Sequence, residues 1–203
     1  MNSRIIIMAI LLSTLGFGQN KGTKSMAKQE LEVAVLGGGC FWCVEAVFER
    51  VEGVKEVISG YAGGHKKNPT YQEVTSGNSG HAEVCEIHFD PDIITYDEIL
   101  EVFWKAHDPT TLNRQGNDYG TQYRSTIYYQ GKGQQLSAES AILNAKDMFE
   151  DPITTEVKPL DTFYKAEVYH QDYFRNNPNV PYCTFVIAPK INKLKKEGTI
   201  WDE

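Results

Sequence analysis

The spacing of hydrophobic residues near the start of the sequence predicts a strand, a tight turn and a helix. Residues 31–36 alternate apolar with small or polar side chains, as in a strand, and three glycines at 37–39 allow a sharp turn. From Phe41 the apolar residues recur at the spacing of one helix face: Val44, Val47, Phe48 and Val51. We expect Gly53 to end this helix as a C-terminal cap, with three glutamates on its solvent side: Glu45, Glu49 and Glu52.

Similar patterns along the rest of the chain predict further strands and two more helices. The strands are expected at residues 54–61, 81–89, 122–129 and 154–158. Thr95 and Glu98 have the spacing of a capping box, which starts a helix with the buried face Ile99, Leu100, Phe103 and Trp104. A longer helix is expected at residues 133–149, before Asp151-Pro152.

The order of these elements is strand, helix, strand, strand, helix, strand, followed by a C-terminal extension. This is the order of the split βαβ motif in ferredoxin-like folds. The sequence therefore predicts an α+β protein with a ferredoxin-like, two-layer α/β core.

The first residues are typical of an export signal. Arg4 precedes an apolar run at residues 5–15, which is too short for a comfortable transmembrane helix, and Gly16-Phe17-Gly18 has the small-x-small pattern of a cleavage site. We expect residues 1–18 to be a signal peptide, 19–30 a polar linker and 31–203 one folded domain in the periplasm or outside the cell. An uncleaved membrane anchor is the alternative.

Composition narrows the choice of partners. The sequence has 41% hydrophobic and 23% charged residues, which is an ordinary balance for a globular protein. Its formal net charge of -7 argues against nucleic acid or an anionic membrane as the main partner. Four cysteines in 203 residues are too few for a scaffold built on disulfides.

Two of these cysteines, Cys40 and Cys43, form the candidate reactive site. Cys40 lies where the glycine turn passes into the predicted helix, and unpaired N–H groups at a helix N-terminus stabilise a thiolate there and lower its pKa. Cys43 follows one helical turn later and is expected on the same side. Cys40 is therefore the candidate nucleophile, and Cys43 can close a disulfide with it.

Three other readings of this Cys-x-x-Cys spacing remain open. It could be half of a zinc site, although no second pair of cysteines follows, or two inert buried thiols. A thioredoxin-like disulfide exchanger also places such a pair at the start of a helix. Here, however, the two intervening residues are the large aromatics Phe41 and Trp42, which could form an apolar wall for a methyl-thioether group.

Gly39-Cys40-Phe41-Trp42 resembles the signature of the methionine sulfoxide reductase A family. Further segments are similar to that family in the same order: 60–64, 68–71, 76–83, 107–110, 114–125 and 169–173. The likeness spans about residues 31 to 190. It implies that 31–203 is a catalytic domain that reduces methionine S-sulfoxide, free and in proteins, and so repairs oxidised proteins. It also implies recycling by thioredoxin or a thioredoxin-like reductant, with no metal or other cofactor. We expect a monomer, although nothing in the sequence identifies the oligomeric state.

The resemblance also assigns roles to individual residues. Cys40 attacks the sulfoxide sulfur and becomes a sulfenic acid, while Glu83 protonates the departing oxygen. The remaining roles are hydrogen bonds to the oxygen from Tyr71 and Tyr123, ordering of the site by Asp118, and methyl binding by Phe41 and Trp42. His170 lies in a matching segment, where a structural hydrogen bond is the simpler role.

The pattern of the third strand supports the assignment of Glu83 independently. Strand alternation places Glu83 on the inward face with Cys85, Ile87 and Phe89. Burial raises the pKa of a carboxyl group and favours its protonated form, which suits a general acid. A structural glutamate satisfied by backbone N–H groups is the alternative.

The resolving cysteine is the main open question. The family commonly has glycine at the position of Cys43, so its presence makes Cys43 a candidate, and its proximity to Cys40 favours it. Cys183 matches a position near the C-terminus where some relatives keep a recycling thiol, so it could resolve instead or relay a disulfide onward. Cys85 is expected to be an inert core thiol.

Overall fold

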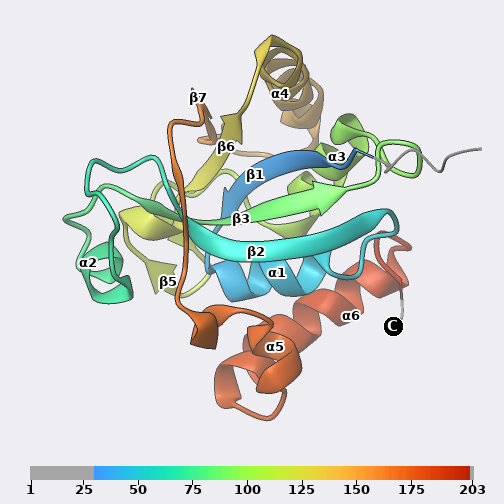
Figure 1. The fold of residues 1–203 in the computed structure, drawn as a ribbon. Helices are drawn as coiled ribbons and strands as arrows, with labels where there is room; N and C mark the ends of the chain where they lie inside the picture. The colour runs from blue at the N-terminus through green and yellow to red at the C-terminus, as the bar shows by residue number, and fades with distance from the viewer. Residues whose placement is uncertain (1–29, 202–203) are drawn as a thin grey trace, which may run out of the picture.

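The computed structural model describes residues 30–201, which form a six-stranded sheet with helices packed against it (Figure 1). The strands follow the order β7-β6-β1-β3-β2-β8 across the sheet. Their bounds are β1 (Glu32–Gly38), β2 (Val54–Ala62), β3 (Ala82–Phe89), β6 (Ser125–Tyr129), β7 (Glu156–Pro159) and β8 (Phe163–Lys165).

The four central strands form the predicted split βαβ core. β3 pairs antiparallel with β1 on one side and with β2 on the other, so β1 and β2 are parallel and α1 (Phe41–Phe48) connects them. β6 pairs antiparallel with the free edge of β1. The predicted fold class is therefore confirmed. Two additions widen the sheet: β7 pairs parallel with β6, and β8 pairs antiparallel with β2.

Helices and short turns complete the described chain. The α-helices after α1 are α2 (Tyr71–Thr75), α3 (Tyr96–Ala106), α4 (Lys132–Ala145), α5 (Tyr173–Asn176) and α6 (Ala188–Lys196). Single turns of helix are η1 (Thr121–Tyr123), η2 (Lys146–Met148), η3 (Val168–His170) and the π-helical η4 (Cys183–Ile187). A small hairpin joins β4 (Arg114–Gln115) to β5 (Asp118–Tyr119).

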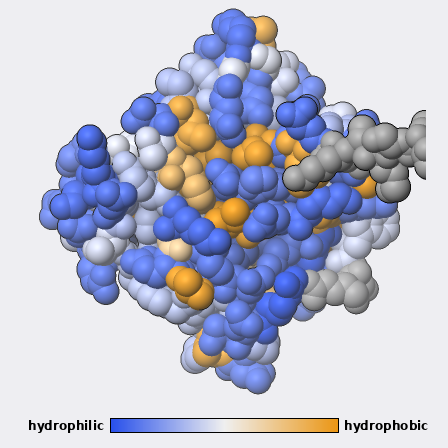
Figure 2. All heavy atoms as spheres, viewed as in Figure 1, coloured by the Kyte–Doolittle hydropathy of each residue, from blue (hydrophilic) through white to orange (hydrophobic). Residues whose placement is uncertain are grey.

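The main hydrophobic core lies between one face of the sheet and the helices α1, α3 and α6. A smaller cluster on the opposite face comprises Val35, Ala62, Ala82, Val84 and Tyr128. The segment from β7 to α5 crosses this second face (Figure 1), and Leu160 and Phe163 from it pack against the cluster. Figure 2 shows hydrophobic residues near the centre of the visible face, surrounded by hydrophilic ones. The C-terminal part of the chain therefore packs against both faces of the sheet.

Several predicted boundaries were wrong by a few residues. α1 ends at Phe48, and residues 121–123 form a turn of 3-10 helix before β6 begins at Ser125. α4 ends at Ala145 and continues as the 3-10 turn η2, while β7 starts at Glu156. The capping box of Thr95 and Glu98 is present at the start of α3.

The expected solvent side of α1 was also wrong. Glu45 is only 1% exposed, and the Glu49 side chain is 10% exposed, whereas Glu52 is exposed as expected. The reason is that α5 packs on α1 from the side opposite the sheet, so the helix is covered on both sides (Figure 1). Residues 1–29 lie outside the described chain, including the expected signal peptide and most of the linker. Within residues 30–201, no helix has the length and apolar character needed to cross a membrane.

The turn before α1 generates a test of the fold. Gly39 has a φ of +97°, and a methyl group there would lie 2.6 Å from Cβ and Cγ of Gln115. We expect Gly39→Ala to lower the free energy of unfolding by roughly 2 kcal/mol, measured by urea denaturation.

Gly133→Ala is the control for this substitution. Gly133 is the second residue of α4 and has nothing within 4 Å of a Cβ atom, so alanine there should leave stability unchanged or raise it by less than about 1 kcal/mol. Equal stability of the two variants would show that the turn at Gly39 does not need glycine.

Candidate active site

Cys40 lies at the junction between the glycine turn and α1. It is the N-cap residue of that helix and is 7% exposed, while Cys43 lies in the first turn and is 4% exposed. The backbone carbonyl of Cys40 accepts hydrogen bonds from the N–H groups of Cys43 (3.0 Å) and Val44 (3.4 Å). The backbone therefore holds both thiols at the buried start of α1.

Glu83 reaches this helix start from β3. The backbone N–H of Phe41, the first residue of α1, donates to Oε2 of Glu83 at 3.1 Å. Glu83 is 1% exposed, and burial raises its pKa to about 8. The hydrogen bond from Phe41 acts in the opposite direction and lowers this pKa, while the negative charges of Asp118 and Cys43 add to the rise. At neutral pH the carboxyl group is therefore mostly protonated and can donate a proton.

The expectation of a lowered pKa for Cys40 was wrong. Burial raises the pKa of Cys40, and its hydrogen bond to Cys43 and the charge of Glu83 raise it further. The first N–H of the helix, which was expected to stabilise the Cys40 thiolate, donates to Glu83 instead. The Cys40 thiol donates to Cys43 and so lowers the pKa of Cys43. Within this pair Cys43 is therefore the more acidic thiol, with Cys40 as its hydrogen-bond donor.

Tyr71 and Tyr123 lie next to the Cys40–Glu83 pair. Burial raises the pKa of Tyr71 to about 12, and the charges of Glu83 and Cys40 add to this effect. The same causes raise the pKa of Tyr123. Both phenols therefore remain protonated and are hydrogen-bond donors beside a thiol and an acid.

Backbone contacts fix the position of each of these tyrosines. Tyr71 is the first residue of α2, and its N–H donates to Glu167 Oε1 at 2.9 Å. Tyr123 ends η1, which is held by the guanidinium of Arg124. That group donates to the Thr121 carbonyl at 2.7 Å and to the Gly80 carbonyl at 3.0 Å. The two rings are thus held by segments that are far apart in the sequence.

Asp118 contacts the thiols through a residue that the sequence reasoning missed. The hydroxyl of Tyr182 donates to Asp118 Oδ2 at 2.6 Å and lies 3.6 Å from Cys43 Sγ. The β4–β5 hairpin carries Asp118, while Tyr182 comes from the C-terminal extension. The aromatic residue directly before Cys183 was the available signal. This chain of contacts reaches both thiols, because Tyr182 is also hydrogen-bonded to Cys40 and lowers the pKa of that thiol against the effect of burial.

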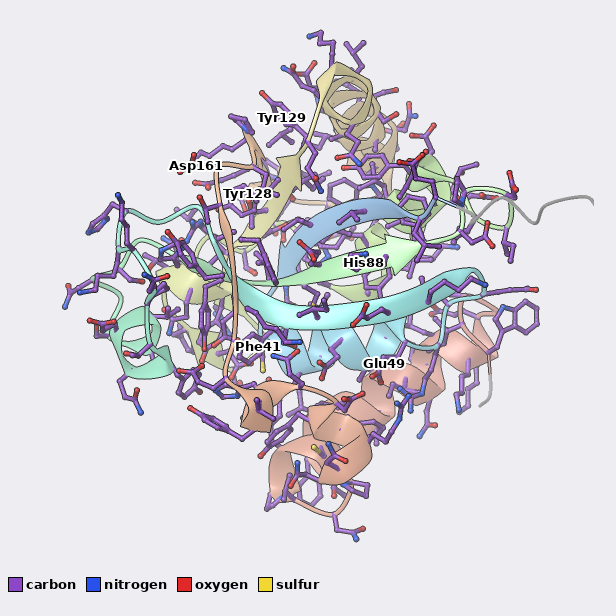
Figure 3. The ribbon with its side chains drawn as sticks, in the orientation of Figure 1. Phe41, Glu49, His88, Tyr128, Tyr129 and Asp161 are labelled. Atoms are coloured by element: carbon purple, nitrogen blue, oxygen red, sulfur yellow. The ribbon has the colours of Figure 1, made fainter. Side chains whose placement is uncertain are left out.

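Aromatic rings form one wall of the site. Trp42 stacks on Tyr173 with ring centroids 3.6 Å apart and planes 6° apart, and the Trp42 ring is partly exposed. Phe41, which is labelled in Figure 3, is fully buried, and its ring centroid lies 6.1 Å from that of Trp42 and 6.5 Å from that of Tyr71. Trp42 is therefore the member of the predicted methyl-binding pair that presents surface to a ligand.

His170 supports the aromatic wall. The indole N–H of Trp42 donates to His170 Nδ1 at 3.2 Å, so the proton of the neutral imidazole lies on Nε2. That atom is buried without a hydrogen-bond partner, 4.0 Å from Glu167 Oε2. Burial lowers the pKa of His170. The neutral ring fits the structural hydrogen bond expected from the sequence.

The other two cysteines differ in their surroundings. Cys183 is buried at the start of η4; burial raises its pKa, and the negative charge of Cys43 raises it further, which places it near Cys43. Cys85 is fully buried in β3, where its thiol donates to the Phe41 carbonyl at 3.5 Å. All four cysteines are free thiols. Within residues 30–201 there is no group of three or more His, Cys, Asp or Glu side chains that could hold a metal.

Comparisons with known proteins show which family this chain belongs to. The family model of peptide methionine sulfoxide reductase matches residues 32–201. The peptide methionine sulfoxide reductase MsrA of Leptospira borgpetersenii serovar Hardjo-bovis is 58% identical over 168 residues, covering 83% of this chain and 96% of that protein. The MsrA of Nautilia profundicola is 53% identical over 165 residues, covering 80% of this chain and 94% of its own.

Solved structures give the same result. Mxr1 from Saccharomyces cerevisiae in reduced form superposes with a TM-score of 0.73 at 30% identity, covering 77% of this chain and 91% of that chain. Methionine sulfoxide reductase A of Corynebacterium diphtheriae has a TM-score of 0.71 at 38% identity, covering 75% and 78%. This chain therefore belongs to the peptide methionine sulfoxide reductase family and is a thiol-dependent enzyme that reduces methionine (S)-S-oxide.

Proposed function

We propose that Cys40 and Glu83 carry out the reduction, with Cys40 as nucleophile and Glu83 as proton donor. The observation that carries this assignment is the Phe41–Glu83 hydrogen bond, which places a protonated buried acid at the start of the helix that bears Cys40. Tyr71 and Tyr123 donate hydrogen bonds to the sulfoxide oxygen, and Trp42, backed by Phe41, packs against the substrate methyl group.

The first step oxidises Cys40. Its proton passes along the existing hydrogen bond to the Cys43 sulfur, and the resulting thiolate attacks the sulfoxide sulfur. Glu83 protonates the sulfoxide oxygen and later regains a proton from solvent. The oxygen is transferred to Cys40, methionine leaves, and Cys40 becomes a sulfenic acid.

The second step closes a disulfide. Cys43 attacks the sulfur of the Cys40 sulfenic acid, its own proton leaves with the hydroxyl group as water, and an S–S bond forms. We assign Cys43 to this role because its side chain is already hydrogen-bonded to Cys40. Cys183, which lies near Cys43, relays the disulfide onward by thiol exchange.

A thioredoxin or thioredoxin-like dithiol then reduces the enzyme disulfide by exchange. A structure of Mxr1 from Saccharomyces cerevisiae in complex with Trx2 supports this assignment by analogy.

We further propose that the enzyme acts as an exported monomer. The apolar run after Arg4 and the Gly16-Phe17-Gly18 pattern support export. Mass spectrometry of the protein from the cell envelope tests it: a mature chain that still carries residues 1–18 in full would contradict cleavage.

The reaction is tested by incubating the enzyme with racemic methionine sulfoxide and dithiothreitol. Chiral chromatography should show loss of the S epimer alone, and Cys40→Ser should abolish it. Glu83→Gln should lower kcat by about 10²–10⁴-fold, because the amide cannot donate an acidic proton. Cys85→Ser serves as the control and should keep most activity. Survival of both epimers alongside disulfide reductase activity would favour a thioredoxin-like exchanger instead.

The resolving cysteine is tested by a single turnover without reductant. With Cys43→Ser, the Cys40 sulfenic acid should accumulate and be trapped by dimedone, which mass spectrometry detects as an adduct at Cys40. With Cys183→Ser, a Cys40–Cys43 disulfide should form and no adduct should appear. The opposite pattern would assign resolution to Cys183.

A further inference from the structure

Glu45 is a buried carboxylate that the reaction above does not use. It lies in the middle of α1, one turn beyond Cys40–Trp42, and is 1% exposed. A carboxylate at such a site is costly unless its oxygens accept hydrogen bonds. The contacts that satisfy it therefore indicate what it does.

Its two oxygens join three separate segments of the chain. Oε1 accepts the hydroxyl of Ser59 in β2 at 3.0 Å, and Oε2 accepts the backbone N–H of Tyr173 at 3.0 Å. Burial raises the pKa of Glu45, while the bonds from the backbone of Tyr173 and Asp172 lower it. The carboxylate thus ties α1 to the sheet on one side and to the start of α5 on the other.

The bond to Glu45 is one of several contacts between α1 and α5, which also include the Arg175–Glu49 ion pair at 3.7 Å. α5 spans only Tyr173–Asn176, and the residue before it, Asp172, adopts a left-handed conformation with φ +51°. The Gln171 side chain holds the preceding backbone to β2, donating to the Ser59 carbonyl at 3.0 Å and accepting from the Ser59 N–H at 3.0 Å. Beyond Gln171, the backbone N–H groups of Asp172 and Tyr173 bond to Glu45, which holds the backbone that carries the Tyr173 ring.

That ring stacks on Trp42 at 3.6 Å. The contacts therefore run from the Glu45 carboxylate through the Tyr173 backbone and ring to the exposed aromatic wall of the site. Both ends of this path lie on α1, since Trp42 and Glu45 belong to the same helix. A shift of α5 relative to α1 would therefore remove the Tyr173 ring from the face of Trp42, leaving the bond to His170 as a remaining hold on the indole.

We propose that Glu45 is a positioning residue for substrate binding, which acts by holding Tyr173 against Trp42. The proposal rests on the proposed function, in which Trp42 contacts the substrate methyl group. A neutral amide in place of the carboxylate removes the negative charge, and an amide oxygen is a weaker acceptor than a carboxylate oxygen, so the bond from the Tyr173 N–H is weakened.

The test is the steady-state kinetics of Glu45→Gln in the full chain, with free methionine (S)-S-oxide as substrate and dithiothreitol as reductant. We expect KM to rise on the order of tenfold, with kcat changed less than twofold, because binding is lost without loss of the reacting groups. Ser59→Ala is the matched control: it also removes a hydrogen bond to Glu45 but keeps the Tyr173 bond, so it should lower stability and leave KM within twofold.

Tyr173→Leu separates positioning from general packing. If Glu45 acts through the Tyr173 ring, Glu45→Gln should raise KM no further in the Tyr173→Leu background. An unchanged KM in Glu45→Gln, an equal rise in both backgrounds, or an unchanged KM in Tyr173→Leu alone would each overturn the proposal. If Glu45→Gln does not fold, Glu45→Asp, which keeps the charge but is one methylene shorter, decides in the same way.

An experiment that contradicts the proposed function can be distinguished from one that contradicts the positioning role of Glu45. Sulfoxide reduction by Cys40→Ser under the same conditions would contradict the assignment of the nucleophile, whatever the Glu45 variants do. An inactive Cys40→Ser together with an unchanged KM in Glu45→Gln would overturn the positioning role of Glu45 alone.

Discussion

The first N–H group of α1, that of Phe41, donates a hydrogen bond to Oε2 of Glu83 at 3.1 Å. This bond joins the start of the helix that carries both thiols to the strand that carries the acid. Because Glu83 is buried there, its pKa rises to about 8 and the group keeps its proton at neutral pH. The hydrogen bond is therefore also the link between a reactive sulfur and a proton source.

This constraint changes how the thiols are activated. A helix N-terminus stabilises a thiolate when its N–H groups are free, but here the first of them serves the acid. Desolvation raises the pKa of Cys40, and Cys43, which Cys40 and Tyr182 both contact, is the more acidic of the two thiols. In the proposed mechanism Cys43 therefore has two roles in sequence, first as acceptor of the Cys40 proton and then as the attacking thiol.

The sequence predicted the elements whose hydrophobic period is strong and local. The alternation in β3 placed Glu83 on the inward face with Cys85, and the glycine turn placed Cys40 at a helix start; the structure brings these groups together. The buried position of Glu45 could not be predicted, because the cover over α1 comes from α5, more than a hundred residues later. The contact of Tyr182 with Asp118 was missed for the same reason, since no local pattern encodes how the C-terminal extension docks.

The proposed chemistry depends most directly on the protonation state of Glu83. It can be measured by ¹³C NMR of protein labelled at the glutamate carboxyl carbons, with the Glu83 signal assigned by its loss in Glu83→Gln. The account predicts a titration midpoint near 8, raised from the ordinary value of 4.5 by burial. A midpoint near 4.5 would mean that the group is ionised at neutral pH, and it would contradict the role of Glu83 as the proton donor.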